Sequence, residues 1–189
     1  MKREYFITVF ICFLIQSVAG QYKFEREYRI EQEEVPKQAI EFIENVNFKK
    51  KVKWYVEESQ DGKTIEAKTT YKGRKHSIEF DTKGAVIDVE IKINFSKLDK
   101  ALQKNIISVL KERFKKFKIR KVQLQFKGQK EALINCITSQ CLIKPSFEIV
   151  LKGKKETTYE LFEMLFDSKG EKILKELKFS ADNFDNLQF

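Results

Sequence analysis

The chain has 189 residues and a formal net charge of +9, and 34% of its residues are charged while 42% are hydrophobic. With 17 Phe against 2 Pro and 7 Gly, the composition excludes a disordered or low-complexity chain and predicts a folded protein with an apolar core. A basic chain favours anionic partners, which are nucleic acids inside a cell and acidic proteins, anionic polysaccharides or lipid head groups outside it.

Residues 1–20 have the three parts of a secretory signal peptide. Lys2 and Arg3 precede an apolar run from Tyr5 to Ile15, and small residues up to Gly20 follow. The run is shorter than the about 20 residues that cross a bilayer. We therefore expect cleavage near Gly20, a periplasmic or secreted product without stable membrane insertion, and no nucleic-acid partner.

Residues 21–95 are predicted to form a first module. Alternation of apolar residues between 22 and 30 indicates an extended segment, and Pro36 opens an amphipathic helix that ends near Lys49. Four strands with glycine-containing turns follow. The strands are expected at 52–56, 65–69, 78–80 and 87–93, and the turns at Gly62, Gly73 and Gly84.

Residues 96–180 are predicted to form a second module, followed by a tail at 181–189. Ser96 is expected to cap a helix whose apolar stripe runs to Phe117. Large apolar groups on both faces of the strand at 159–166 indicate either a bulge or cover on both sides, by the rest of the chain or by a partner. The four strands are expected at 122–126, 147–151, 159–166 and 173–179, with an insertion at 128–145.

A short motif occurs twice. Phe-Asp-Thr-Lys-Gly at 80–84 returns as Phe-Asp-Ser-Lys-Gly at 166–170, and apolar residues follow each copy. We expect the two aspartates to bond the backbone of their own turns and not to act as an acid–base pair. The predicted fold is α+β, with two tandem modules that each pack one helix on an antiparallel β-sheet of about four strands.

Two cysteines, Cys136 and Cys141, remain after removal of residues 1–20. An even number in an exported chain favours a disulfide, and a ring this small constrains its loop more than the whole fold. A metal or redox pair is the alternative, but the Cys-x4-Cys spacing matches neither a zinc knuckle nor an oxidoreductase motif. We predict a structural disulfide.

The sequence has few parts for catalysis. His76 is the only histidine, which argues against a histidine-based metal site and favours an ordinary surface residue. Phosphate-binding loops, nucleophile elbows and zinc-protease motifs are missing from the sequence. We therefore predict no catalytic residue, no cofactor and no metal.

The basic run at 111–121 carries six net positive charges and has two readings. It is either a dock for an anionic partner or an ordinary solvated helix end, where cations suit the helix dipole. Phe114 and Phe117 within it fit a buried helix stripe better than a base-stacking platform.

We expect the helix-free sheet face of the first module to bind a partner. Alternation turns its apolar residues toward the helix and leaves a tyrosine among mostly cationic groups on the other face. Tyrosine is an efficient anchor, and lysines steer an acidic partner. The candidate binding residues are Lys53, Tyr55, Lys68, Thr70, Lys75 and Lys92.

The order Val35-Pro36, amphipathic helix, Trp54 on the first strand and a final hairpin with Phe-Asp-x-x-Gly resembles the PepSY-like periplasmic proteins of Bacteroidota, whose tandem form is similar in fold to beta-lactamase inhibitor protein. The resemblance covers roughly residues 30–180, and the second copy keeps Phe166-Asp167 but lacks the tryptophan. It implies an exported, non-enzymatic module that binds another protein.

The sequence thus predicts an inhibitor or regulator of an envelope or secreted protein, with an acidic protein as partner. Two alternatives remain open, an envelope protein that binds anionic polysaccharide or lipid, and an enzyme of an unrecognised type. The identity of the partner and the oligomeric state stay open.

Overall fold

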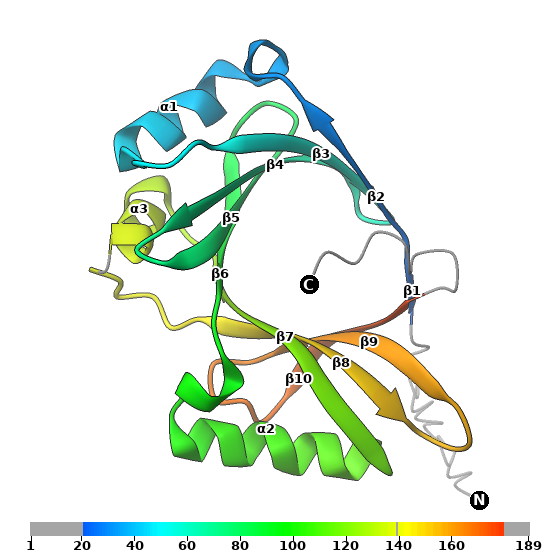
Figure 1. Ribbon diagram of the computed structural model, residues 1–189. Coiled ribbons are helices and arrows are strands. Elements are labelled where there is room, and N and C mark those ends of the chain that lie inside the picture. The colour runs from blue at the N-terminus through cyan, green and yellow to red at the C-terminus, as the bar shows by residue number, and fades with distance from the viewer. Residues whose placement is uncertain (1–20, 139, 180–189) are drawn as a thin grey trace, which may run out of the picture.

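The computed structural model describes residues 21–138 and 140–179 (Figure 1). The predicted signal peptide and the tail at 181–189 lie outside these residues. The helices are α1 (Lys37–Val46), α2 (Lys100–Arg113) and α3 (Lys130–Thr138), with short 3-10 turns at Gln32–Glu34 and Phe95–Lys97. The strands are β1 (Gln21–Lys23), β2 (Glu25–Ile30), β3 (Lys53–Ser59), β4 (Gly62–Tyr71), β5 (Arg74–Phe80), β6 (Val86–Lys92), β7 (Lys116–Phe126), β8 (Ser146–Lys154), β9 (Tyr159–Phe166) and β10 (Ile173–Phe179).

All ten strands belong to one sheet, in the order β1-β10-β9-β8-β7-β6-β5-β4-β3-β2. The two outermost strands, β1 and β2, are consecutive in the chain and are separated only by Phe24. β1 pairs with β10 in parallel and β2 pairs with β3 in antiparallel orientation. The first segment of the chain therefore joins the two edges, and the sheet bends into a nearly closed barrel (Figure 1).

The predicted architecture of two tandem modules with separate four-stranded sheets is wrong. Each half does contain a helix followed by four strands, but β6 and β7 pair directly, with Val89 opposite Phe126 and Ile91 opposite Leu124. Two separate sheets of this length would each expose unpaired edge strands, which are costly and prone to aggregation. Pairing β6 with β7 and joining the two outer strands through the β1–β2 segment leaves less of those edges exposed.

The apolar core lies between the outer surface of the sheet and the helices. α1 and α3 cover the part around β3–β6, where Phe42, Trp54 and Phe80 are buried together. α2 covers the part around β7–β9, where Ile106, Leu110 and Phe162 are buried. Because these two large apolar clusters lie outside the barrel, the inner face of the sheet carries mostly polar side chains, with one small apolar cluster of Val150, Leu161 and Phe179.

Most helix ends differ from the sequence prediction, and the capping residues explain where the helices begin and end. α1 starts directly after Pro36 and ends at Asn47, which adopts a left-handed conformation with φ of 55°. α2 is capped by Asp99, whose carboxylate accepts from the backbone N–H groups of Ala101 and Leu102, and not by Ser96. α2 also ends at Arg113, so that Phe117 belongs to the long strand β7.

The insertion at 128–145 contains α3, and the predicted disulfide between Cys136 and Cys141 is confirmed. Cys136 is buried in the same apolar cluster as Leu133 and Ile137. The disulfide therefore ties the end of α3 to the segment that leads into β8.

The two copies of the Phe-Asp-x-Lys-Gly motif form turns that share one backbone hydrogen bond, from the glycine N–H to the aspartate carbonyl, and differ in the side-chain bonds of the aspartate. Asp81 Oδ1 accepts from the backbone N–H groups of Lys83 and Ala85, and Asp167 Oδ1 accepts from those of Glu171 and Lys172. Both aspartates thus bond their own turns, as predicted.

Strand β9 is apolar on both faces because both are covered from within the chain. Phe162, Met164 and Phe166 pack in the cluster beneath α2, while Leu161 lies on the other face with Val150 and Phe179. None of the described helices is long and apolar enough to cross a membrane.

Candidate functional site

The inner face of the barrel encloses a cavity of about 670 Å³, to which all ten strands contribute side chains. Its size falls within the about 300–1,000 Å³ of many ligand sites, but most of its lining is charged. The acidic side chains are Glu25, Glu57, Asp61, Glu66, Glu79, Asp88, Glu90, Glu148 and Glu163, and the basic ones are Lys23, Lys50, Lys51, Lys53, Lys68, Lys75, Lys92, Lys121, Lys127 and Lys175.

The structure brings all six sequence-predicted binding residues to this cavity. They come from β3, β4, β5 and β6, whose inner faces form one wall of the barrel. Whether they bind a partner stays a prediction. The residues are Lys53, Tyr55, Lys68, Thr70, Lys75 and Lys92.

Lys68 differs from the other predicted lysines because its charge is neutralised within the chain. Its ammonium group forms ion pairs with Glu27 and with Glu66, the latter at 2.9 Å, and lies 5.0 Å from the centre of the Tyr55 ring. Burial alone lowers the pKa of Lys68, but Glu66 and Glu27 outweigh it and raise that pKa. Lys68 therefore orders the tyrosine and the carboxylates around it.

Lys53, Lys75 and Lys92 have no ion-pair partner within the described part of the chain. Lys75 and Lys92 flank the paired residues His76 and Ile91 on neighbouring strands, so that their side chains project from the same face. Burial lowers the pKa of Lys92, and the charges of Lys75 and Lys121 lower it further. This end of the cavity has an excess of positive charge.

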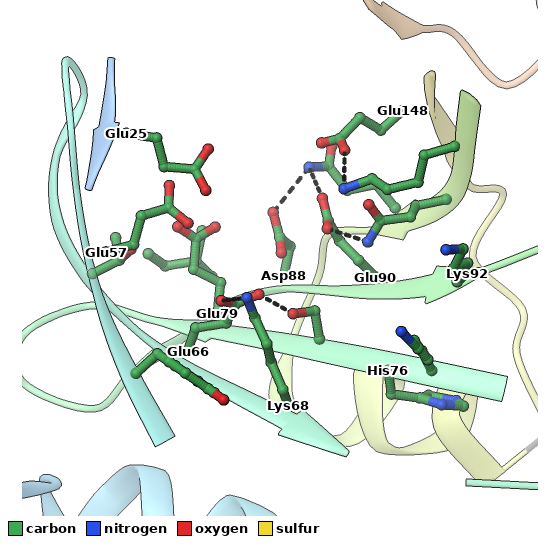
Figure 2. A pocket seen from close by; sticks show the side chains of 18 of the residues that line it. Glu25, Glu57, Glu66, Lys68, His76, Glu79, Asp88, Glu90, Lys92 and Glu148 are labelled. Atoms are coloured by element: carbon green, nitrogen blue, oxygen red, sulfur yellow. Dashed lines mark hydrogen bonds and ion pairs between the residues drawn. The ribbon is translucent and has the colours of Figure 1, made fainter. Parts of the chain in front are cut away.

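Carboxylates gather farther along the same strands. Glu79 lies directly opposite Asp88, and Ser77 lies directly opposite Glu90. Figure 2 shows that the carboxylates of Glu25, Glu57 and Asp88 point into the same space. Asp88 is four residues from Lys92 on β6, a distance of about 13 Å along a strand. The inner wall is therefore divided into a lysine end and a carboxylate end.

The carboxylate end holds acids that resist ionisation. Burial raises the pKa of Glu57 to about 8, with Glu25 and Glu66 adding to the effect. Burial and then Glu79 raise the pKa of Asp88 to about 7, although Lys127 and Gln125 contact its carboxylate. Such shifts reflect negative charges held close together away from water. A positively charged group placed among them would be strongly favoured.

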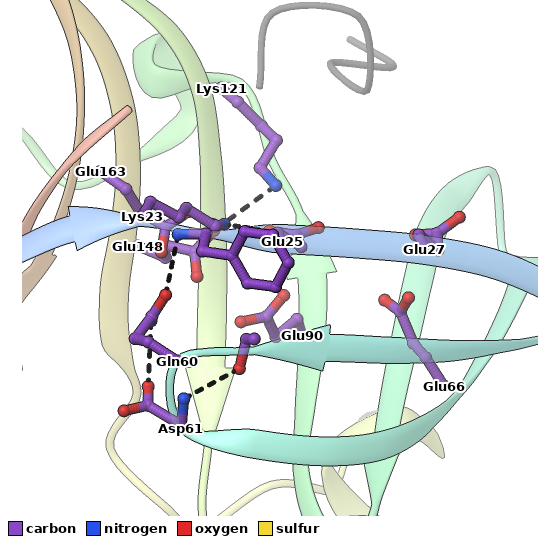
Figure 3. Close-up of polar contacts among 12 residues, drawn as sticks. Lys23, Glu25, Glu27, Gln60, Asp61, Glu66, Glu90, Lys121, Glu148 and Glu163 are labelled. Carbon is purple, nitrogen blue, oxygen red and sulfur yellow. Dashed lines mark hydrogen bonds and ion pairs between the residues drawn. The ribbon is translucent and has the colours of Figure 1, made fainter. Parts of the chain in front are cut away.

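Opposite this wall, ion pairs cross the seam where the barrel closes (Figure 3). Lys23 of β1 contacts Glu163 of β9 at 2.6 Å and Glu25 of β2 at 2.5 Å. Lys121 contacts Glu148 at 3.4 Å, and Lys121 and Lys23 together outweigh burial and lower the pKa of Glu148. These groups hold the shape of the cavity.

Sequence reasoning placed Glu79 on this face but missed the other carboxylates, although the signal was present. Glu57 follows Tyr55 by two residues, Glu66 precedes Lys68 by two, and Glu90 precedes Lys92 by two. The same alternation that selected the lysines thus assigns these acids to the same face. What alternation could not show is that the sheet bends until this face surrounds a cavity.

His76 is buried, with 2% of its surface exposed, so the prediction of a surface histidine is wrong. It packs beside the rings of Phe48 and Tyr71, and its Nδ1 lies 2.9 Å from the carbonyl oxygen of Arg74. Burial lowers its pKa. Within residues 21–138 and 140–179, no group of three or more His, Cys, Asp or Glu side chains is arranged to hold a metal ion.

No protein-family model matches the chain, and no curated protein matches its sequence. Two solved structures are similar to it. One is a DUF2874 family protein from Bacteroides ovatus, with 14% identity, 76% of this chain and 87% of that chain covered, and a TM-score of 0.52. The other is a BLIP-like protein from Bacteroides fragilis, with 15% identity, 82% of this chain and 92% of that chain covered, and a TM-score of 0.50.

The fold is BLIP-like. At these identities the likeness extends to the course of the backbone and not to the side chains of the cavity. The more specific resemblance to PepSY-like proteins remains a prediction.

Proposed function

We propose that this chain is a non-enzymatic binding protein that recognises a charged segment of another protein in the cavity of its barrel, and that it thereby inhibits or regulates that protein. The observation that carries the proposal is the division of the inner wall into a lysine end and a carboxylate end. A structural core gains nothing from several carboxylates that are crowded together and buried, because each one costs desolvation energy.

The positions of the lysine end and the carboxylate end also indicate which charges the partner carries. A segment that places an acidic group near Lys75 and Lys92, and a lysine or arginine near Glu57, would neutralise both ends together. Complementary charge of this kind gives specificity and fast association. Tyr55 lies between the two ends on β3, with Lys68 over its ring, and supplies a rigid aromatic surface.

The proposal is tested with a charge-reversal variant, Lys53→Glu, Lys75→Glu and Lys92→Glu. The matched control is Lys97→Glu, Lys100→Glu and Lys104→Glu, which changes the net charge equally at exposed positions around α2. Lys68 is left unchanged, because its reversal would place another carboxylate beside Glu27 and Glu66.

The wild-type protein and both variants are immobilised and exposed to an extract of the producing cells, and the retained proteins are identified by mass spectrometry. A partner of the cavity should be retained by the wild type and the control and lost from the cavity variant, and the purified partner should bind at least tenfold more weakly to that variant. Equal retention by all three proteins would contradict the proposal.

The likeness to a BLIP-like protein makes a β-lactamase the first defined partner to assay. Hydrolysis of a chromogenic cephalosporin is followed while the protein is added to the enzyme. Inhibition that saturates near one molecule per enzyme, and that the cavity variant relieves, supports this partner. An unchanged rate of hydrolysis would show that the β-lactamase is not the partner, and the partner would then have to be identified by the extract experiment.

A further inference from the structure

Four lysines form a regular array on the ends of β7 and β8. Lys116 lies directly opposite Lys154, and Lys118 lies directly opposite Lys152. Phe117 and Ile119, which alternate with the β7 lysines, pack on the other face against the cluster beneath α2. The lysines therefore share the inner face of the sheet, beyond the wall that lines the cavity, and we call them the lysine array.

The lysine array is unusual because it lacks counter-charges. Like charges placed directly opposite each other destabilise a sheet, and none of the four forms an ion pair among residues 21–138 and 140–179. By contrast, the nearby Lys155 and Arg113 both contact Glu176, at 2.8 and 2.6 Å. The chain neutralises these two cations and leaves the array positive.

An aromatic residue completes the array. Tyr159 of β9 lies directly opposite Lys154, and 49% of its surface is exposed. The ammonium groups of Lys152 and Lys154 lie 5.1 and 5.7 Å from the centre of that ring. The ring offers an apolar surface and a hydroxyl group beside the cations.

The spacing of the array matches that of an extended peptide. Lysines two residues apart on one strand are separated by about 6.6–6.8 Å, and same-face side chains of an extended peptide repeat at the same interval. A bilayer is a poor match, since the array lies on the inner face of a sheet that bends into a nearly closed barrel (Figure 1). β8 is paired on both sides at the array, but β7 pairs with β6 only from Gln123 to Phe126. A ligand can therefore lie across the face or along the free edge of β7 beside Lys116 and Lys118.

We propose that the lysine array binds an extended acidic peptide segment with carboxylates at alternate positions. The inference rests on the proposed function, because the segment would belong to the protein whose charged part enters the cavity. Attraction to the array would steer the partner and orient it toward the barrel.

The test uses a fluorescently labelled ten-residue peptide of alternating Glu and Thr, with binding followed by anisotropy at low salt and at 150 mM salt. The array variant carries Lys116→Gln, Lys118→Gln, Lys152→Gln and Lys154→Gln. The control variant carries four changes of the same charge at exposed positions, Lys83→Gln, Lys97→Gln, Lys100→Gln and Lys104→Gln.

The wild type should bind the peptide, the array variant should bind at least tenfold more weakly, and the control should stay within twofold of the wild type. An isomeric peptide with its five Glu in one block should bind at least threefold more weakly than the alternating one. Thermal unfolding should show that the array variant is folded, with a melting temperature equal to or above that of the wild type because like-charge repulsion is removed.

Equal losses in the array and control variants would overturn the inference, since net charge alone would then explain binding. The inference would also be overturned if the alternating peptide did not bind, while chondroitin sulfate or vesicles containing phosphatidylglycerol bound to the wild type and not to the array variant. The variant with Lys53→Glu, Lys75→Glu and Lys92→Glu separates the two proposals. If that variant no longer captures the partner, and if peptide binding does not depend on the array, the proposed function of the cavity would be supported and the proposal for the lysine array refuted.

Discussion

Glu79 of β5 and Asp88 of β6 lie directly opposite each other on the inner face of the barrel, so two carboxylates meet where a sheet normally pairs opposite charges. Asp88 is 2% exposed, and the burial and the neighbouring charge raise its pKa to about 7. With Glu57, whose pKa is about 8, the cavity contains acids that change charge near neutral pH.

These raised pKa values predict that the protein loses stability as the pH rises. Between the ordinary pKa of each acid and its raised value, the folded chain binds more protons than the unfolded chain, so the free energy of unfolding falls with rising pH. The fall should extend from about pH 4 to 7 for Asp88 and from about pH 4.5 to 8 for Glu57. Urea unfolding at pH 5, 6, 7 and 8.5 measures it.

Glu57→Gln should reduce this dependence, because glutamine has no charge to bury. At pH 8.5 the variant should be more stable than the wild type by about 1–3 kcal/mol, while at pH 5 the two should be similar. Glu58→Gln, one residue away on the opposite face, is the control and should leave the slope unchanged. A Glu57→Gln variant with the wild-type slope would mean that Glu57 does not titrate as described.

The turn between β5 and β6 should depend on glycine for two separable reasons. Gly84 has φ of +91°, and an added Cβ would lie 2.9 Å from the backbone nitrogen of Ala39 in α1. Gly73, in the turn between β4 and β5, is the comparison, with φ of +76° and no atom within 4 Å of such a Cβ. Gly73→Ala should therefore cost only the backbone strain of about 1 kcal/mol, and Gly84→Ala should cost about 2–4 kcal/mol. Equal losses in urea unfolding would show that the turn does not pack against α1.

Reduction of the disulfide should weaken the protein without unfolding it. The ring between Cys136 and Cys141 spans five residues in sequence, for which loop entropy gives about 2 kcal/mol. Urea unfolding with and without a reductant should show a loss of that size, with the far-UV circular dichroism spectrum of the folded state preserved. Reaction of both thiols with an alkylating agent in the native, unreduced protein would show that the disulfide is absent.

Much of the local structure follows from the sequence. The alternation of Trp54 and Val56 with Tyr55 places the first two toward the helix, and the glycines at 62, 73 and 84 do mark turns. The disulfide follows from the number and spacing of the cysteines and from the expected export of the chain. These features depend on neighbouring residues, which is why a pattern can reveal them.

The arrangement of the sheet could not be obtained in that way. Pairing of Val89 with Phe126 joins strands that are separated by α2, and nothing in either strand specifies its partner. Closure depends on Gln21 pairing with Leu177 at the far end of the chain. The site could not be predicted fully for the same reason. Alternation along β3 and β4 showed which face Tyr55 and Lys68 occupy, but it did not show that Glu148 and Glu163 line the same cavity.

The most direct test of the central claim is photo-crosslinking from inside the barrel. A benzoylphenylalanine residue replaces Tyr55 on the inner face of β3 or, as the control, Tyr28 on the outer face of the adjacent strand β2, where it lies opposite Val56. Irradiation of the producing cells should yield one discrete protein adduct from position 55, which is lost when Lys75→Glu and Lys92→Glu are added, and no such adduct from position 28. An adduct from position 28 alone, or one from position 55 that survives both charge reversals, would contradict binding in the cavity.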